Sequence, residues 1–360
     1  MTREPQPEDL SRRQMLGLLA GGVVGVGTGG VVAFRLSRAG GSTEIPGAAF
    51  SGPTTTTTED DPADATTTTT EPEASEPRTE PYQPVRDEVF VEAKLAGVRV
   101  VEALMTYQAA TGLEAPLAAA VELSRGTLSR PDLAEAAEVL VLPDTDSVAR
   151  VVYPQLGGLH PHTDPTSASI MVVVDQHLLH DGVETVVSRC VDVRVVLDGL
   201  EWRLERVADT SGPPVPQPSE LSAEAERVLG HSRIDMPDAV RWDIYEGIID
   251  TRILNEMADL ADRTPIAVTT CMRGHPVHVF GTSGLSAHSV GRAVDIWAVG
   301  DQPVVQQRDN TDSVAHSVCQ DLYDSGRIHR LGAPWAFDGV GGRSWTDPVH
   351  QDHLHLGVSA

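Results

Sequence analysis

SAHSVGRAVDIW, residues 286–297, joins a turn to a β-strand pattern and carries polar side chains at defined points of both. Residues 293–299 alternate in character, so Asp295 occupies one face of the expected strand and its apolar neighbours occupy the other. His288 precedes this strand across a turn that contains Gly291, and glycine accepts turn conformations that other residues avoid. We therefore expect His288 to fold back beside Asp295.

The chain ends on a second segment of this kind, HQDHLHLGV, residues 350–358. In an extended strand His353 and His355 share one face, and the leucines that follow each of them share the other. If this strand lies beside strand 293–299, then His288, Asp295 and His355 converge on one point. Two imidazoles and a carboxylate suit Zn²⁺ at about 2.0–2.2 Å and leave a fourth position for water. Such a site lowers the pKa of its water toward about 7 and polarises a peptide carbonyl.

The pattern S-x-H-x-x-G-x-A-x-D followed by a terminal H-x-H resembles a zinc metallopeptidase superfamily. Its members are the D-alanyl-D-alanine carboxypeptidases and dipeptidases, the murein endopeptidases and the amino-terminal domain of hedgehog proteins. The resemblance covers the last third of the chain, and the stretch around the motif also looks like an exported actinobacterial branch of unassigned substrate. It implies Zn²⁺ as cofactor on His288, Asp295 and His355, and peptidoglycan stem peptides or cross-links as substrate.

The histidines before the last ligand are similar to those of the endopeptidase form, where they take part in catalysis. The carboxypeptidase branch places a glutamate three residues before its last ligand as general base, and that position is Asp352 here. The side chain of aspartate is one methylene shorter than that of glutamate. An imidazole titrates near neutral pH and can accept a proton there. We therefore predict His353 as the general base, oriented by Asp352 or His350.

Two further residues are candidates for substrate binding. Arg273 follows a buried strand pattern at 266–271, where relatives carry an arginine that binds a substrate carboxylate or the oxyanion. A surface arginine is the alternative. Ser286 is expected to form hydrogen bonds within the site and is not a nucleophile, because no triad partners accompany it. His275 and His278 are expected to be loop or structural histidines.

A non-catalytic function remains an alternative. The zinc site could serve structure or the binding of wall peptides, as the likeness to hedgehog proteins implies. A third interpretation makes the exported region a scaffold on which the preceding domain recruits a protein partner.

The residues around the motif predict an α+β domain at 222–360 with a central antiparallel sheet. Helical patterns cover 249–260 and 312–324, and Gly326 closes the second. Cys271 and Cys319 lie in this domain and could form a disulfide, or could be buried free thiols.

A second α+β domain is expected at 85–212, with a helix at 89–107 followed by strands at 169–179, 186–197 and 200–207. Asp198-Gly199 between the last two strands predicts a hairpin turn. Helices followed by a curved antiparallel sheet resemble the cone-shaped nuclear transport factor two-like fold. His160, His162, His177 and His180 show no spacing typical of a metal site. We assign this domain to support or partner contact.

The N-terminal residues predict export. Arg12-Arg13 stand before a Gly-rich apolar run at 16–34, which is typical of a twin-arginine signal, and a membrane anchor is the alternative for residues 1–39. Residues 40–84 are rich in Thr, Pro, Glu and Asp and predict a disordered linker. Either interpretation places the rest of the chain outside the cytoplasmic membrane, with membrane contact only through 16–34.

The charge argues against one class of partner. The formal net charge is −25, and Lys94 is the only lysine. A chain this acidic repels phosphate backbones, so a nucleic-acid partner is not expected.

Overall fold

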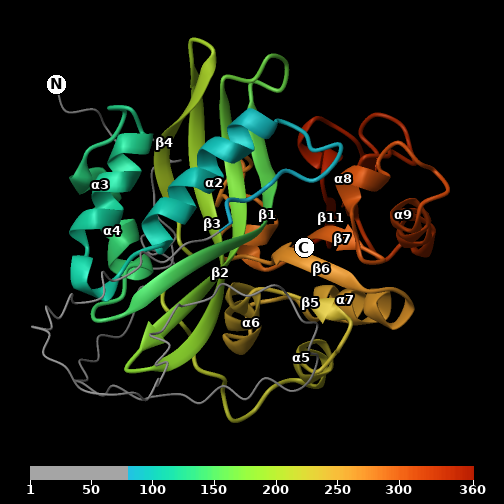
Figure 1. Cartoon of the computed structure of the whole chain (residues 1–360). Helices are drawn as coiled ribbons and strands as arrows, with labels where there is room; N and C mark the ends of the chain where they lie inside the picture. Colours follow the sequence, from blue (N-terminus) through green and yellow to red (C-terminus); the bar gives the residue numbers. More distant parts are fainter. Residues whose placement is uncertain (1–79) are drawn as a thin grey trace, which may run out of the picture.

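The computed structural model describes residues 80–360, and in this part the chain is α+β, with helices packed on two β-sheets (Figure 1). The predicted signal or anchor at 1–39, and the predicted linker up to residue 79, lie outside the described residues. Among residues 80–360, no helix has both the length and the apolar composition needed to cross a bilayer.

The first sheet is antiparallel and has the order β1-β2-β3-β4. Its strands are β1 (Asp146–His160), β2 (Ser167–His180), β3 (Val183–Asp198) and β4 (Glu201–Asp209). The hairpin predicted at Asp198-Gly199 is confirmed, because these residues join β3 to β4 and Gly199 has a φ of 65°. β1 is an edge strand, which is why it accommodates Pro154 without loss of a ladder hydrogen bond.

From residue 80 onward, three helices precede this sheet: α2 (Val91–Met105), α3 (Glu114–Leu123) and α4 (Arg130–Leu140), with a 3₁₀ turn η2 (Ala109–Thr111) between the first two. α2 is the helix predicted at 89–107, and it crosses the sheet in contact with all four strands (Figure 1). α4 begins with a capping box at Ser129 and Asp132. Apolar residues of the helices and the sheet form one core, and Tyr82 also packs against it.

The second sheet is mixed, with the order β10-β9-β11-β7-β6-β5 and β8 paired to β7. Its strands are β5 (Ile234–Asp235), β6 (Ile266–Thr270), β7 (Ala293–Val299), β8 (Gln302–Pro303), β9 (Arg330–Gly332), β10 (Ser344–Trp345) and β11 (Leu354–Gly357). The expected central antiparallel sheet is present from β9 to β6, but β10 and β5 add parallel pairs at the two edges. Each parallel pair is only two residues long, too short to leave an alternating pattern in the sequence.

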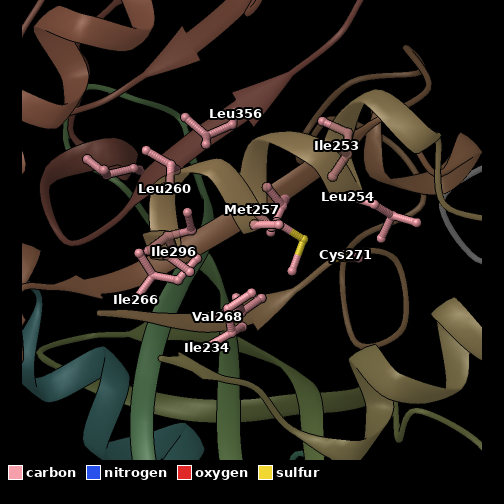
Figure 2. Close-up of a cluster of buried hydrophobic side chains, with 14 of the residues drawn as sticks. Ile234, Ile253, Leu254, Met257, Leu260, Ile266, Val268, Cys271, Ile296 and Leu356 are labelled. Atoms are coloured by element: carbon pink, nitrogen blue, oxygen red, sulfur yellow. The ribbon is translucent and has the colours of Figure 1, made fainter. Parts of the chain in front are cut away.

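The helices of this part are α5 (Ala223–Leu229), α6 (Asp238–Tyr245), α7 (Thr251–Arg263), α8 (Val304–Gln307) and α9 (Val314–Ser325), with 3₁₀ turns η3 (His288–Val290) and η4 (Val349–Gln351). α7 begins where the Asp250 side chain accepts a hydrogen bond from the N–H of Arg252. Gly326, in the left-handed region at φ 70°, ends α9 as predicted. The apolar face of α7 packs on the sheet, as Figure 2 shows for Leu260, Met257, Val268, Ile296 and Leu356.

The buried apolar residues form two clusters, one from residues 93–204 and one from residues 225–358. One residue crosses this division: Val349 of η4 belongs to the first cluster, although it stands near the end of the chain. The domain bounds 85–212 and 222–360 stay a prediction, as does the likeness of the first part to the cone-shaped fold.

Candidate metal centre

Pairing of β7 with β11 creates the centre. The two strands are antiparallel neighbours, which is the condition on which the expected convergence depended, and their register sets Asp295 opposite His355. Alternation then directs both side chains to the same face, while Leu354 and Leu356 enter the hydrophobic core. The Nδ1 atom of His355 lies 3.0 Å from Oδ1 of Asp295.

His288 reaches the same point from the turn before β7. Gly291 in this turn has a φ of 69°, and a Cβ there would lie 1.9 Å from the carbonyl oxygen of Ile248, so only glycine fits. The Nδ1 of His288 donates to the carbonyl of Cys271 at 2.7 Å. In a neutral imidazole this hydrogen bond selects the tautomer whose Nε2 is an acceptor. That Nε2 lies 3.1 Å from Oδ1 of Asp295 and 3.1 Å from Nδ1 of His355.

We call His288, Asp295 and His355 the donor cluster. Their three facing atoms are 3.0–3.1 Å apart. Such a triangle has a radius of about 1.8 Å, so an ion about 1 Å above it lies about 2.0–2.1 Å from each atom, a normal zinc–ligand distance. In its neutral form His288 offers an Nε2 acceptor beside the Asp295 carboxylate, and a cation between two such acceptors removes their repulsion. The donor cluster therefore fits zinc in chemistry and in geometry.

His275 also approaches the centre. It offers a ligand atom within 4.8 Å of those of His288 and Asp295, so these three residues form a possible metal-binding group. Its ring stacks on His288 with the centroids 3.9 Å apart, and its Nε2 lies 4.0 Å from Oδ2 of Asp295. His275 was expected to be a loop or structural histidine, and its position beside the centre was not predicted. The atoms of the donor cluster are closer together than His275 is to Asp295.

The protonation states of the centre suit metal binding, which requires neutral imidazoles and an ionised carboxylate. Burial lowers the pKa of His355 to about 4, and burial likewise holds the pKa of His275 well below its usual value. Burial raises the pKa of Asp295, but positive charge on the adjacent His288 and His353 in the metal-free centre outweighs it and keeps this pKa well below the usual range.

Asp352 and His353 form a buried dyad beside the donor cluster. Oδ1 of Asp352 lies 2.7 Å from Nδ1 of His353, and Nε2 of His353 lies 3.8 Å from Oδ2 of Asp295. Both side chains are at most 2% exposed. Burial alone lowers the pKa of His353, but Asp295 and Asp352 reverse this effect and raise it.

A second dyad lies at the margin. Nδ1 of His350 is 2.8 Å from Oδ1 of Asp347, and the His350 ring lies 5.0 Å from that of His353 and edge-on to Trp345. The side chains of His350, His355 and His275 are 15%, 11% and 11% exposed, so solvent meets the centre on this side.

The structure gives no support to the substrate-binding predictions for Arg273 and Ser286. The Arg273 guanidinium lies 3.1 Å from Asp243 and 2.8 Å from Glu246, and it donates to the carbonyl of Ser211. Ser286 is 5% exposed, and its hydroxyl accepts a hydrogen bond from the N–H of His288, which stabilises the turn.

Two residues of the first sheet region reach the centre, and the sequence analysis assigned a role to neither. Gln155 of β1 donates to Oδ2 of Asp295 at 2.8 Å. Lys94 of α2 donates to Oδ2 of Asp352 at 2.6 Å. Only for Lys94 did the sequence hold a signal, because it is the single lysine of a very acidic chain.

The other candidates remain apart from the centre. His177 lies by Glu184, and His180 contacts the carbonyl of Asp144. The three cysteines are buried and free, so the possible disulfide between Cys271 and Cys319 is not formed.

Comparison of the chain with family models, with curated proteins and with solved structures found no match in any of the three.

Proposed function

We propose that this protein is a zinc-dependent peptidase of the cell envelope that acts on peptidoglycan stem peptides or their cross-links. The observation that carries the proposal is the Asp352–His353 dyad, in which Nε2 of His353 faces Asp295 of the donor cluster across 3.8 Å. A metal centre kept only for structure has no need of an oriented base.

In this proposal His288, Asp295 and His355 hold the metal, the set implied by the resemblance to the zinc metallopeptidase superfamily. Zinc, when bound there, polarises a peptide carbonyl and acidifies a water molecule. Nε2 of His353 takes a proton from water as the water oxygen bonds to the carbonyl carbon, and it gives this proton to the amine when the C–N bond breaks.

Asp352 acts as the group that orients this base. Its Oδ1 contacts His353, and its Oδ2 accepts from Lys94 and from the N–H of Leu156 at 2.9 Å. Because both oxygens are engaged, Asp352 is poorly placed to accept a further proton, and His353 is the better base.

The substrate class and the compartment rest on the sequence. The resemblance implies wall peptides, and the twin-arginine pattern implies that the chain reaches the wall. A substrate would approach from the side of His275, His350 and Trp345, where the centre meets solvent.

A non-catalytic zinc module that binds wall peptides is the second candidate. The burial of the dyad and of the donor cluster favours it, since His288 is fully buried and Asp295 is 1% exposed.

The test is made on the purified full chain, with metal content and turnover measured on one preparation. We expect one zinc per chain, and new amines or released D-Ala when digested peptidoglycan is incubated with it. A zinc-loaded chain that leaves every wall fragment intact would contradict the peptidase and favour the binding module.

A further inference from the structure

Gln155 stands 140 residues before Asp295 in the sequence, yet its side-chain amide contacts the Asp295 carboxylate. Nε2 donates to Oδ2 of Asp295, and Oε1 accepts from the hydroxyl of Thr269 on β6. Gln155 and Thr269 are both fully buried. Both ends of the amide are therefore satisfied inside the protein, and its orientation is fixed.

This contact gives the two oxygens of the Asp295 carboxylate different partners. Oδ1 of Asp295 faces His288 and His355, whereas Oδ2 receives the amide of Gln155. A hydrogen bond to one oxygen restricts rotation of the carboxylate, so the other oxygen keeps one orientation. Hydrogen bonds of this kind orient metal-binding side chains.

The strand that carries Gln155 is fixed against the second sheet by neighbours on both sides of it. The ring of Tyr153 stacks on Trp297 of β7, with the centroids 4.7 Å apart and the planes within 13°. The N–H of Leu156 donates to Asp352. Alternation along β1 places Tyr153 and Gln155 on the same side, toward the centre.

Close approach of the two parts indicates a permanent contact. A Cβ on Gly158 of β1 would lie 2.2 Å from Cβ of Phe280, and a Cβ on Gly274 would lie 2.2 Å from the carbonyl oxygen of Cys190. Val349, one residue before His350, is buried in the core of the first part. Shape complementarity of this kind is typical of a fixed core and not of a removable lid.

We propose that Gln155 is a positioning residue of the metal centre, so that the centre is built by both parts of the chain. Gln155 holds Asp295 in the orientation that binds the metal, and Thr269 holds Gln155. This inference rests on the proposed zinc site.

The test compares Gln155→Met with Gln176→Met in the full chain. Gln176 is a matched control: it is also a buried glutamine of the same sheet, 1% exposed, but it donates to Leu140 and Ser147, away from the centre. We expect Gln155→Met to weaken zinc binding about 10–100-fold in a chelator competition. Gln176→Met should bind zinc as the wild type does. The thermal shift produced by added zinc should shrink in the first variant only, because that shift follows affinity.

A second variant keeps the test decisive if Gln155→Met does not fold. Thr269→Val removes the hydroxyl that holds Oε1 of Gln155 and preserves the shape of the side chain. It should weaken zinc binding less than Gln155→Met does, and it should add nothing to the effect of Gln155→Met in the double variant.

Wild-type zinc affinity in both Gln155→Met and Thr269→Val would overturn the positioning role and leave the zinc site standing. A wild-type chain that binds no zinc would instead overturn the proposed function, so the two failures are distinct.

Discussion

Lys94 and Asp352 are 258 residues apart in the sequence and form an ion pair of 2.6 Å between Nζ and Oδ2. Neither side chain is more than 1% exposed. Lys94 also pairs with Glu88 at 2.6 Å, so one ammonium group bridges two buried carboxyl groups. One of these carboxylates orients the proposed base, and the pair therefore links the first part of the chain to the chemistry of the second.

Lys94→Met should destabilise the protein by about 3–5 kcal/mol, because it leaves two buried carboxylates without their cation. The change is measured as the free energy of unfolding in denaturant. The double variant Lys94→Met/Glu88→Gln removes one of the stranded charges and should recover part of the loss. Equal stabilities of the wild type and Lys94→Met would show that the pair contributes nothing.

His355→Ala should lose zinc and turnover together, because a missing ligand dismantles the site. His278→Ala is the control, since His278 lies in a loop and forms an isolated backbone β-bridge with Leu285. Metal analysis of the two purified variants separates them. A full complement of zinc in His355→Ala would exclude His355 as a ligand.

His275→Ala should retain one zinc per chain. Its Nε2 lies 4.0 Å from Asp295, farther than the 3.0–3.1 Å spacing of the donor cluster. Loss of the metal from this variant would instead make His275, His288 and Asp295 the ligand set.

Gly274→Ala should lower the free energy of unfolding by more than Gly182→Ala does. Both glycines have a positive φ, 76° and 75°, so each substitution carries the same backbone cost of about 1–2 kcal/mol. A Cβ at Gly182 meets nothing within 4 Å, whereas at Gly274 it meets Cys190 across the contact between the two parts. Equal decreases in the free energy of unfolding would mean that the contact between the two parts accommodates the added methyl group.

Much of the donor cluster could be predicted because its geometry is local or periodic. Strand alternation placed Asp295 and His355 on facing positions, and the glycine requirement at Gly291 predicted the turn that returns His288. The hairpin at Gly199 and the end of α9 at Gly326 followed from the same backbone argument.

The remaining contacts depend on how distant segments pack, which no local pattern encodes. Gln155 lies among mainly apolar residues at 151–159, and nothing near it in the sequence indicates Asp295. The expectation for Arg273 rested on the resemblance alone, and Asp243 and Glu246 of the α6 region bind its guanidinium. His275 reaches the centre only because the loop after β6 folds back onto His288.

The central claim is that His353 acts as the base of a zinc peptidase. The test compares wild type, His353→Ala and Asp352→Asn. For each protein, turnover of peptidoglycan fragments and zinc content are measured on the same sample. His353→Ala should keep its zinc and lose about 10²–10⁴-fold in rate. Asp352→Asn should keep its zinc and lose about 10–100-fold, because it only orients the base. Wild-type turnover by zinc-loaded His353→Ala, or a larger loss in Asp352→Asn than in His353→Ala, would contradict the account.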